Sequence, residues 1–191
     1  PLVEQAVETV MPVSKLRYVA FSHYEADECG ALNEWLAAAP DSVPLCGAVA
    51  AMVSVDDVAD RPARALQDGE VVSLGEHSVK WIETPHLPHG WECGHLMELS
   101  TGTLLRGDLF SQPGDGHPAI TESDILGPSE AFRAQMDYFS HTADAAALID
   151  KLAAERPKVL ACMHGSCWKG DGAALLRQLG ERLVSREPSA R

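Results

Sequence analysis

The sequence predicts a single α/β domain over residues 1–191, with several β-hairpins beside its helices. Short apolar runs typical of strands are interspersed with stretches of helical spacing, without the regular strand–helix–strand order of a doubly wound sheet. Hydrophobic residues make up 46% of the chain and charged residues 23%, the balance of a folded globular protein. A chain of 191 residues can also bury a substantial core.

The first third of the chain is expected to alternate helices with strands. Apolar residues recur at helical spacing over 2–10, and the mainly apolar run Leu16–Phe21 is typical of a strand. A helix is expected over Gly30–Ala39, and it should end there because the proline that follows cannot continue it. A short buried strand at 43–47 and a helix at 48–59 complete this part.

The middle of the chain is expected to form hairpins. Residues 69–85 contain two short apolar runs around Gly75, and residues 94–110 contain two more around a Ser-Thr-Gly turn. Residues 111–127 include three glycines and two prolines, so an irregular loop is expected there. A loop this long in a compact domain is often functional.

The last third is expected to contain helices with one buried strand between them. Ser129 is placed to cap a helix over Ser129–Phe139. The remaining elements are a helix over Ala143–Glu155, a strand within 157–165 and a helix over 172–184.

Composition disfavours several classes of partner. The formal charge of −13 repels nucleic acid and anionic lipid surfaces, and no apolar stretch approaches the roughly 20 residues that cross a bilayer. The five cysteines are scattered and form no CxxC pair, which favours a reducing cytoplasm. We therefore expect a cytoplasmic protein that binds neither nucleic acid nor membranes.

Candidate metal ligands follow four separate apolar strands. Imidazole nitrogen and carboxylate oxygen together suit zinc, iron or manganese. One His-x-Glu-x-Asp segment alone is also typical of a solvated acidic loop, but ligands at four strand ends predict a dinuclear metal site. The residues are His23, Glu25 and Asp27 after the first strand, His86 and His89 after residues 79–85, Asp108 after 103–107, and His164 after 158–163.

Two geometric arguments support this hypothesis. Alternate residues of an extended segment point the same way, so His23, Glu25 and Asp27 are expected to converge or to divide between two adjacent ions. An aspartate can also give one oxygen to each of two cations, which makes Asp108 a candidate bridge.

The same order of residues resembles the metallo-β-lactamase fold superfamily over Leu16–Trp168. The second ligand position holds a glutamate, as in the flavodiiron and oxygen-binding di-iron branch. The resemblance implies an αββα sandwich, which is expected to lack its first strands because no strand precedes the first expected helix. Flavodiiron enzymes also carry a flavodoxin domain, for which 191 residues leave no room.

The resemblance also implies a ligand set. The 19-residue step from His89 to Asp108 favours His89 as the ligand, and His86 is expected to be a hydrogen-bond partner or a loop residue. The family usually has a histidine where this chain has Glu28, so the last ligand of the second metal is Glu28, a water or nothing. One metal is expected on His23, Glu25, His89 and Asp108, and the other on Asp27, Asp108 and His164.

The expected function is to bind, sense or reduce O2 at two metal ions. Glu25 adds negative charge and an oxygen donor, which suits iron better than zinc. Iron is therefore the favoured metal, with zinc and manganese as the alternatives. Electrons would come from a separate protein, and a homo-oligomer is one possible state. The alternative is a hydrolase that activates water to cleave an ester, lactone, thioester or phosphoester, so the sequence leaves open an oxidoreductase or a hydrolase. A degenerate domain that binds metal weakly or not at all is a third possibility.

Overall fold

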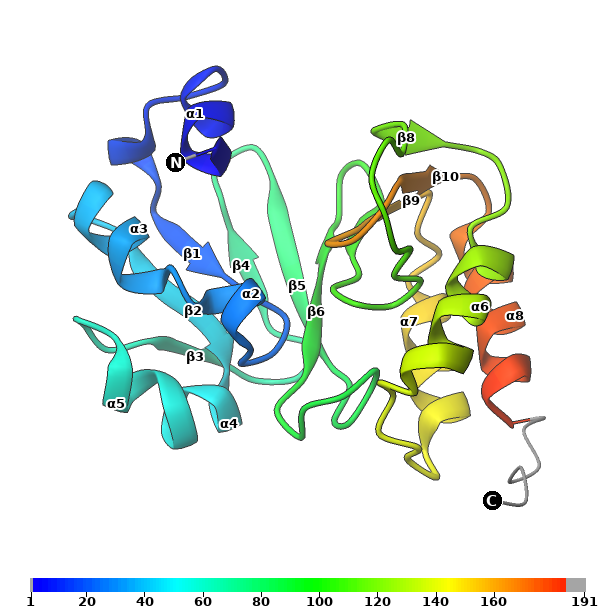
Figure 1. Ribbon diagram of the computed structural model, residues 1–191. Helices are drawn as coiled ribbons and strands as arrows, with labels where there is room; N and C mark the ends of the chain where they lie inside the picture. The colour runs from blue at the N-terminus through cyan, green and yellow to red at the C-terminus, as the bar shows by residue number, and fades with distance from the viewer. Residues whose placement is uncertain (1, 185–191) are drawn as a thin grey trace. The chain divides into compact units, whose positions relative to one another are not determined.

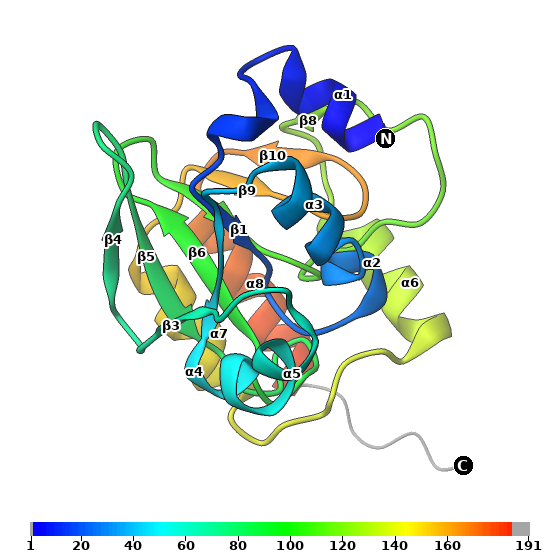
Figure 2. The ribbon, with the colours of Figure 1, turned by 90° about the vertical axis from the view of Figure 1, so that its left-hand side faces the viewer.

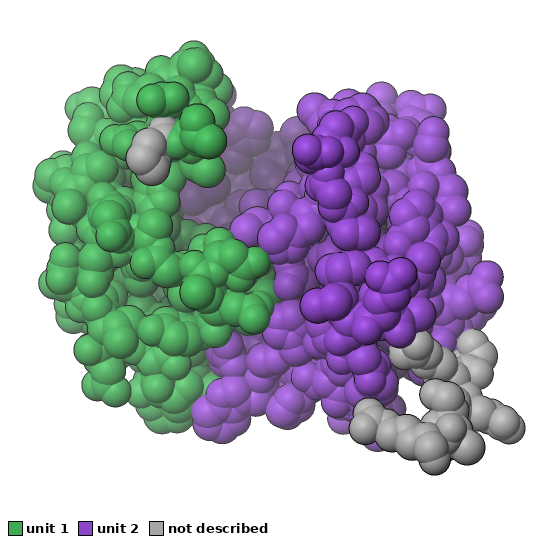
Figure 3. Space-filling model, in the orientation of Figure 1, with its two compact units in different colours: residues 1–67 green, residues 68–191 purple. Residues whose placement is uncertain are grey.

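The computed structural model describes residues 2–184, which form two compact units (Figure 3). Unit 1 comprises the described residues up to Gln67, and unit 2 those from Asp68 onward. The mixed α/β class expected from the sequence is confirmed. The prediction of one domain over residues 1–191 stays a prediction.

Unit 1 is built on a three-stranded sheet in the order β1-β2-β3, and all of its strands are parallel (Figure 1). Parallel strands need long crossover connections, which α2 and α3 supply between the first two strands and α4 to α5 between the last two. The elements are α1 (Leu2–Glu8), η1 (Val13–Lys15), β1 (Tyr18–Ala20), α2 (Ala26–Cys29), α3 (Leu32–Ala38), β2 (Val43–Gly47), α4 (Ala48–Ala50), the π-helical turn η2 (Ala51–Val55), α5 (Asp56–Val58) and β3 (Arg64–Leu66).

The core of unit 1 fixes the segment that carries its candidate ligands. Phe21, directly before that segment, is buried, and Leu32, shortly after it, is buried in the same cluster. Figure 2 shows this segment leaving β1 and turning into α2. The other buried members of the cluster are Leu36, Cys46, Ala50, Ala51 and Val55.

Unit 2 contains a seven-stranded sheet in the order β4-β5-β6-β7-β9-β10-β8. Neighbouring strands from β4 to β7 are antiparallel, whereas β7 and β9 are parallel. As a result β5, β7 and β9 all run in the same direction. The strands are β4 (Val71–Ser73), β5 (Ser78–Glu83), β6 (Gly94–Glu98), β7 (Thr103–Leu105), β8 (Ile120–Thr121), β9 (Val159–Ala161) and β10 (Cys167–Lys169).

Three helices pack against this sheet: α6 (Leu126–Met136), α7 (Ala145–Ala154) and α8 (Gly172–Val184) (Figure 1). Leu104 and Leu160 of the sheet share one buried cluster with Leu152 of α7 and Leu176 of α8. This apolar layer holds β7 and β9 in place. No helix within residues 2–184 has the length and apolar character needed to cross a membrane.

The structure corrects the sequence predictions at a few points. The short strands β3, β8 and β10 were missed, because each has only two or three residues and does not lie within a longer apolar run. Ser129 was wrongly expected to cap a helix, since it is buried inside α6. Asp124 instead accepts hydrogen bonds from the backbone N–H groups of Leu126 (2.8 Å) and Gly127 (3.1 Å). The other expected helices and strands are confirmed, with bounds that differ by a few residues.

Replacing Leu176 by alanine should strongly destabilise unit 2. Leu176 is fully buried in the cluster that holds β7 and β9, and truncating such a residue typically costs about 2–5 kcal/mol. Chemical unfolding measures the loss. Gln178→Ala, on an exposed position of the same helix, is the control and should change the free energy of unfolding by less than about 0.5 kcal/mol. Equal effects of the two changes would contradict the packing described.

Candidate metal centre

The candidate ligands of unit 2 follow the three strands that run in the same direction. Leu105 of β7 is paired with Ala161 of β9, and Asp108 and His164 each come three residues later. His89 follows β5, which runs the same way. Because strands that run in one direction end at the same edge of a sheet, the topology gathers these side chains. The pairing of β7 with β9 is therefore what brings His164 to Asp108.

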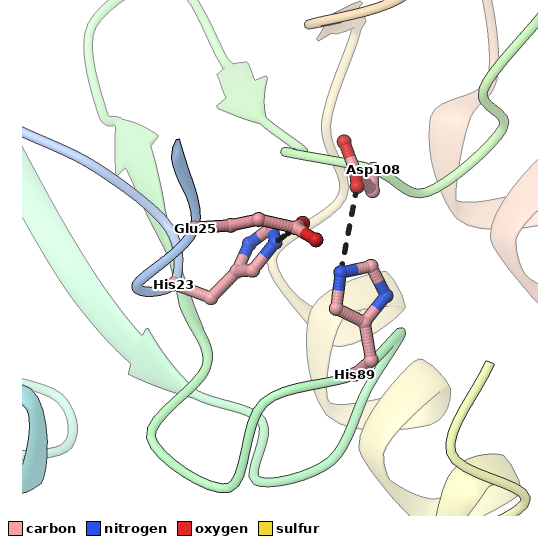
Figure 4. Close-up of side chains that lie close together, drawn as sticks. All are labelled: His23, Glu25, His89 and Asp108. Atoms are coloured by element: carbon pink, nitrogen blue, oxygen red, sulfur yellow. Dashed lines mark hydrogen bonds and ion pairs between the residues drawn. The ribbon is translucent and has the colours of Figure 1, made fainter. Parts of the chain in front are cut away.

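Asp108 lies between two histidines and offers a different oxygen to each. Its Oδ2 is 3.6 Å from His89 Nε2, and its Oδ1 is 3.5 Å from His164 Nε2. Figure 4 shows the His89 ring directed at this carboxylate. Two ligand atoms that each lie roughly 2.1 Å from one metal ion, at angles of about 90–120°, are roughly 3.0–3.6 Å apart. Both distances fit a shared ion better than a direct hydrogen bond.

The backbone of Asp108 is held in place by two hydroxyl groups. Ser111 Oγ donates to the Asp108 carbonyl at 2.9 Å, and Tyr138 Oη donates to the same oxygen at 3.2 Å. The Tyr138 ring also lies edge-on to the His89 ring, with centroids 6.0 Å apart. Burial raises the pKa of Tyr138, so its phenol keeps the proton that it donates. Tyr138 was missed from the sequence because nothing local relates it to a strand end.

Arg106 is a second residue that the sequence reasoning missed. It is fully buried, its guanidinium stacks over the Phe110 ring at 5.4 Å, and it donates to the Ser166 carbonyl at 3.2 Å. Burial lowers its pKa to about 10, which still leaves it positively charged at neutral pH. Arg106 thus ties the end of β7 to the loop that carries His164.

In unit 1, His23 and Glu25 form a pair of candidate metal ligands. His23 is almost completely buried, and its Nε2 lies 3.0 Å from Glu25 Oε2 (Figure 4). Glu25 has extended backbone angles, φ −142° and ψ 156°, and directly precedes α2. Glu25 is therefore the last residue with extended angles before the helix begins. The distance within this pair also fits two ligands of one ion.

The expectation that Asp27 continues an extended segment is wrong. Asp27 and Glu28 both lie in the first turn of α2, where successive side chains rotate by about 100° instead of alternating. Asp27 as a metal ligand stays a prediction, now without that geometric argument. Glu28 accepts hydrogen bonds from the backbone N–H of Ser22 (3.3 Å) and from its hydroxyl (3.2 Å).

His86 and His89 share one loop but face different surroundings. His86 is exposed, has φ 66° and lines a pocket of about 210 Å³ together with Arg133 and Phe139. His89 is instead the residue placed beside Asp108. This placement favours the expected choice of His89 as the ligand of this loop.

Several solved structures share this fold. Rubredoxin oxygen:oxidoreductase from Desulfovibrio gigas matches with a TM-score of 0.76 and 20% identity, over 94% of this chain and 47% of that one. The metal-soaked Flv1 flavodiiron core from Synechocystis matches with a TM-score of 0.76 and 20% identity, over 97% of this chain and 47% of that one. The apo chemotaxis sensor ODP from T. denticola matches with a TM-score of 0.75 and 17% identity, over 93% of this chain and 73% of that one.

These comparisons establish the fold. The chain has the metallo-β-lactamase-like fold of the core of flavodiiron proteins, as the sequence predicted. The chain spans about half the length of the rubredoxin oxygen:oxidoreductase and of the Flv1 core, 47% of each. No protein-family model and no curated protein matches the chain.

Replacing His89 should lower metal binding, whereas replacing His86 should not. His89→Ala removes a donor next to Asp108, while His86→Ala removes an exposed side chain that faces a separate pocket. Bound metal per chain, measured by elemental analysis after dialysis, checks this. Loss of metal from the His86 variant alone would show that the ligand of this loop has been misassigned.

Proposed function

We propose that this protein holds two metal ions, with iron favoured, and uses them to bind, sense or reduce O2. The observation that carries the proposal is the position of Asp108 between His89 and His164, with one carboxylate oxygen toward each imidazole. A carboxylate that offers one oxygen to each of two neighbouring cations is a typical bridge of dinuclear sites.

The donor set fits two such ions. His23 and Glu25 in unit 1 have the spacing of two ligands on one ion, as do the pairs that Asp108 forms in unit 2. We propose the ligand set that the sequence predicts. One ion is assigned to His23, Glu25, His89 and Asp108, and the other to Asp27, Asp108 and His164.

Iron and O2 are favoured by ligand chemistry. Three of the six assigned ligands, Glu25, Asp27 and Asp108, are carboxylates, which stabilise the ferric state and make the set less suited to zinc. Iron ions held here would supply the exchange of electrons with O2. Two proteins of the same fold carry names that point the same way, an oxygen:oxidoreductase and a chemotaxis sensor whose di-iron form is described as a peroxy species.

The surrounding residues would act by keeping the donors in position. Ser111 and Tyr138 fix the Asp108 backbone, and the Tyr138 ring restricts rotation of the His89 imidazole. Groups that orient ligands in this way commonly change metal affinity by about 10–100-fold when they are removed. A separate electron-transfer protein and a cytoplasmic location belong to this proposal. The hydrolase has no observation specifically in its favour.

Replacing Asp108 by asparagine should abolish the iron site. The amide is neutral and cannot bridge two cations, so iron content should fall from about two per chain to nearly zero. Iron is quantified after expression in iron-sufficient medium under low oxygen, and O2 is then added to the reduced protein. The wild-type absorption spectrum should change and that of Asp108→Asn should not. Asp115→Asn, on an exposed loop, is the control and should behave as wild type.

Two outcomes would contradict the proposal. Wild-type protein that holds zinc, is silent to O2 and cleaves a thioester or lactone would establish the hydrolase. Wild-type protein that retains no metal in any preparation would indicate the degenerate domain.

Replacing Glu25 by histidine should shift metal preference toward zinc. Imidazole substitutes a neutral nitrogen donor for a carboxylate, and nitrogen-rich sites suit zinc. The ratio of bound iron to bound zinc, measured after loading with equal concentrations of both, should fall severalfold. Glu34→His on α3 makes the same chemical change on an exposed position and should leave the ratio unchanged. An unchanged ratio in the Glu25 variant would remove this residue from the ligand set.

A further inference from the structure

Ser22 connects the glutamate of α2 to the first candidate ligand. Its Oγ lies 3.2 Å from Glu28 Oε2 and 2.8 Å from His23 Nδ1, and its backbone N–H donates to the same Glu28 oxygen at 3.3 Å. All three residues belong to unit 1, and they lie between the end of β1 and the start of α3. They form a continuous chain of hydrogen bonds from Glu28 to the His23 ring.

The number of protons available to these hydrogen bonds determines which atom donates in each of them. A serine hydroxyl has one proton, and an ionised carboxylate can only accept. The approach of Ser22 Oγ to Glu28 Oε2 is therefore favourable only if the serine proton lies between these two oxygens. The serine oxygen must then accept from its other neighbour, so His23 carries a proton on Nδ1.

The opposite side of the ring then requires a cation. With Nδ1 protonated, the Nε2 atom of neutral His23 has a lone pair, and that atom lies 3.0 Å from Glu25 Oε2. A lone pair and a carboxylate oxygen repel each other unless a positive charge lies between them. That charge is either a second ring proton or a metal ion, and the chain of hydrogen bonds leaves Nε2 available to the metal.

We propose that Glu28 is a positioning residue rather than a metal ligand, and that it acts through Ser22 to hold His23 in the tautomer with Nδ1 protonated and Nε2 directed to the metal. This inference rests on the proposed metal site. It assigns a role to the position where the family usually has a histidine: the glutamate orients His23 through the ring nitrogen that does not face the metal. Glu28 Oε2 already accepts two hydrogen bonds from Ser22, which favours this role over direct ligation.

Zinc affinity of the purified protein, measured by competition with a chromophoric chelator, tests the proposal. Removing a partner that orients a ligating histidine typically weakens binding by about 10–100-fold. Glu28→Ala and Ser22→Ala should each weaken zinc binding to this extent. The double variant should be no weaker than either single variant, because both changes break the same chain of hydrogen bonds. Glu34→Ala removes an exposed carboxylate nearby and should have no effect.

Glu28→Gln separates positioning from ligation. The glutamine side-chain oxygen can still accept from Ser22, so this variant should keep zinc affinity within a few-fold of wild type. A direct ligand, in contrast, would lose affinity with its charge. Glu28→Gln as weak as Glu28→Ala, or a Ser22→Ala variant as tight as wild type, would overturn the proposal.

The tautomer itself gives a second readout. In zinc-loaded protein with ¹⁵N-labelled histidine, NMR should show a His23 proton on Nδ1 that is protected from solvent exchange. This protection should be lost in Glu28→Ala and Ser22→Ala and kept in Glu28→Gln. A His23 proton on Nε2 would contradict the inference directly. Wild-type protein that binds no zinc or iron would instead overturn the proposed metal site, so the two failures are distinguishable.

Discussion

The parallel pairing of β7 with β9 is the constraint on which the candidate site of unit 2 depends. Leu105 and Ala161 are partners in this pair, and the chain advances by the same number of residues from each before it reaches Asp108 and His164. A shift of the register by one residue would turn the side chains of one strand to the opposite face. The apolar layer formed by Leu104, Leu160 and the helices behind them thus determines the spacing of two polar groups at the strand ends.

Precision at this site comes from groups that are not ligands. Ser111 and Tyr138 both donate to the backbone carbonyl of Asp108, and Arg106 connects the end of β7 to the His164 loop. In unit 1, Ser22 and Glu28 form the hydrogen bonds that orient His23. Asp108, His89 and His23 therefore each have a protein partner that limits their motion. Partners of this kind commonly orient the ligands of metal sites.

The fold alone does not decide the chemistry. Proteins of one fold can carry different reactions, and activity has to be argued from the groups at the site. Here Glu25 would supply a carboxylate oxygen where a histidine would supply a nitrogen, and Glu28 accepts two hydrogen bonds from Ser22, the residue before His23. Both positions lie on the short segment between β1 and α3. The identity of the metal and the use made of it are therefore expected to depend mainly on this segment.

The sequence by itself determined the α/β class and most helices and strands, because hydrophobic periodicity is a local property of the chain. It also determined that candidate ligands follow strands, since a buried strand must end before a charged side chain can be solvated or bound. It wrongly predicted an extended backbone at Asp27, which lies in α2, and it left the role of Glu28 open. Tyr138, Arg106 and the pairing of β7 with β9 were decided only in the tertiary structure. They join residues far apart in the chain, and no local period of the sequence encodes which distant strands and side chains meet.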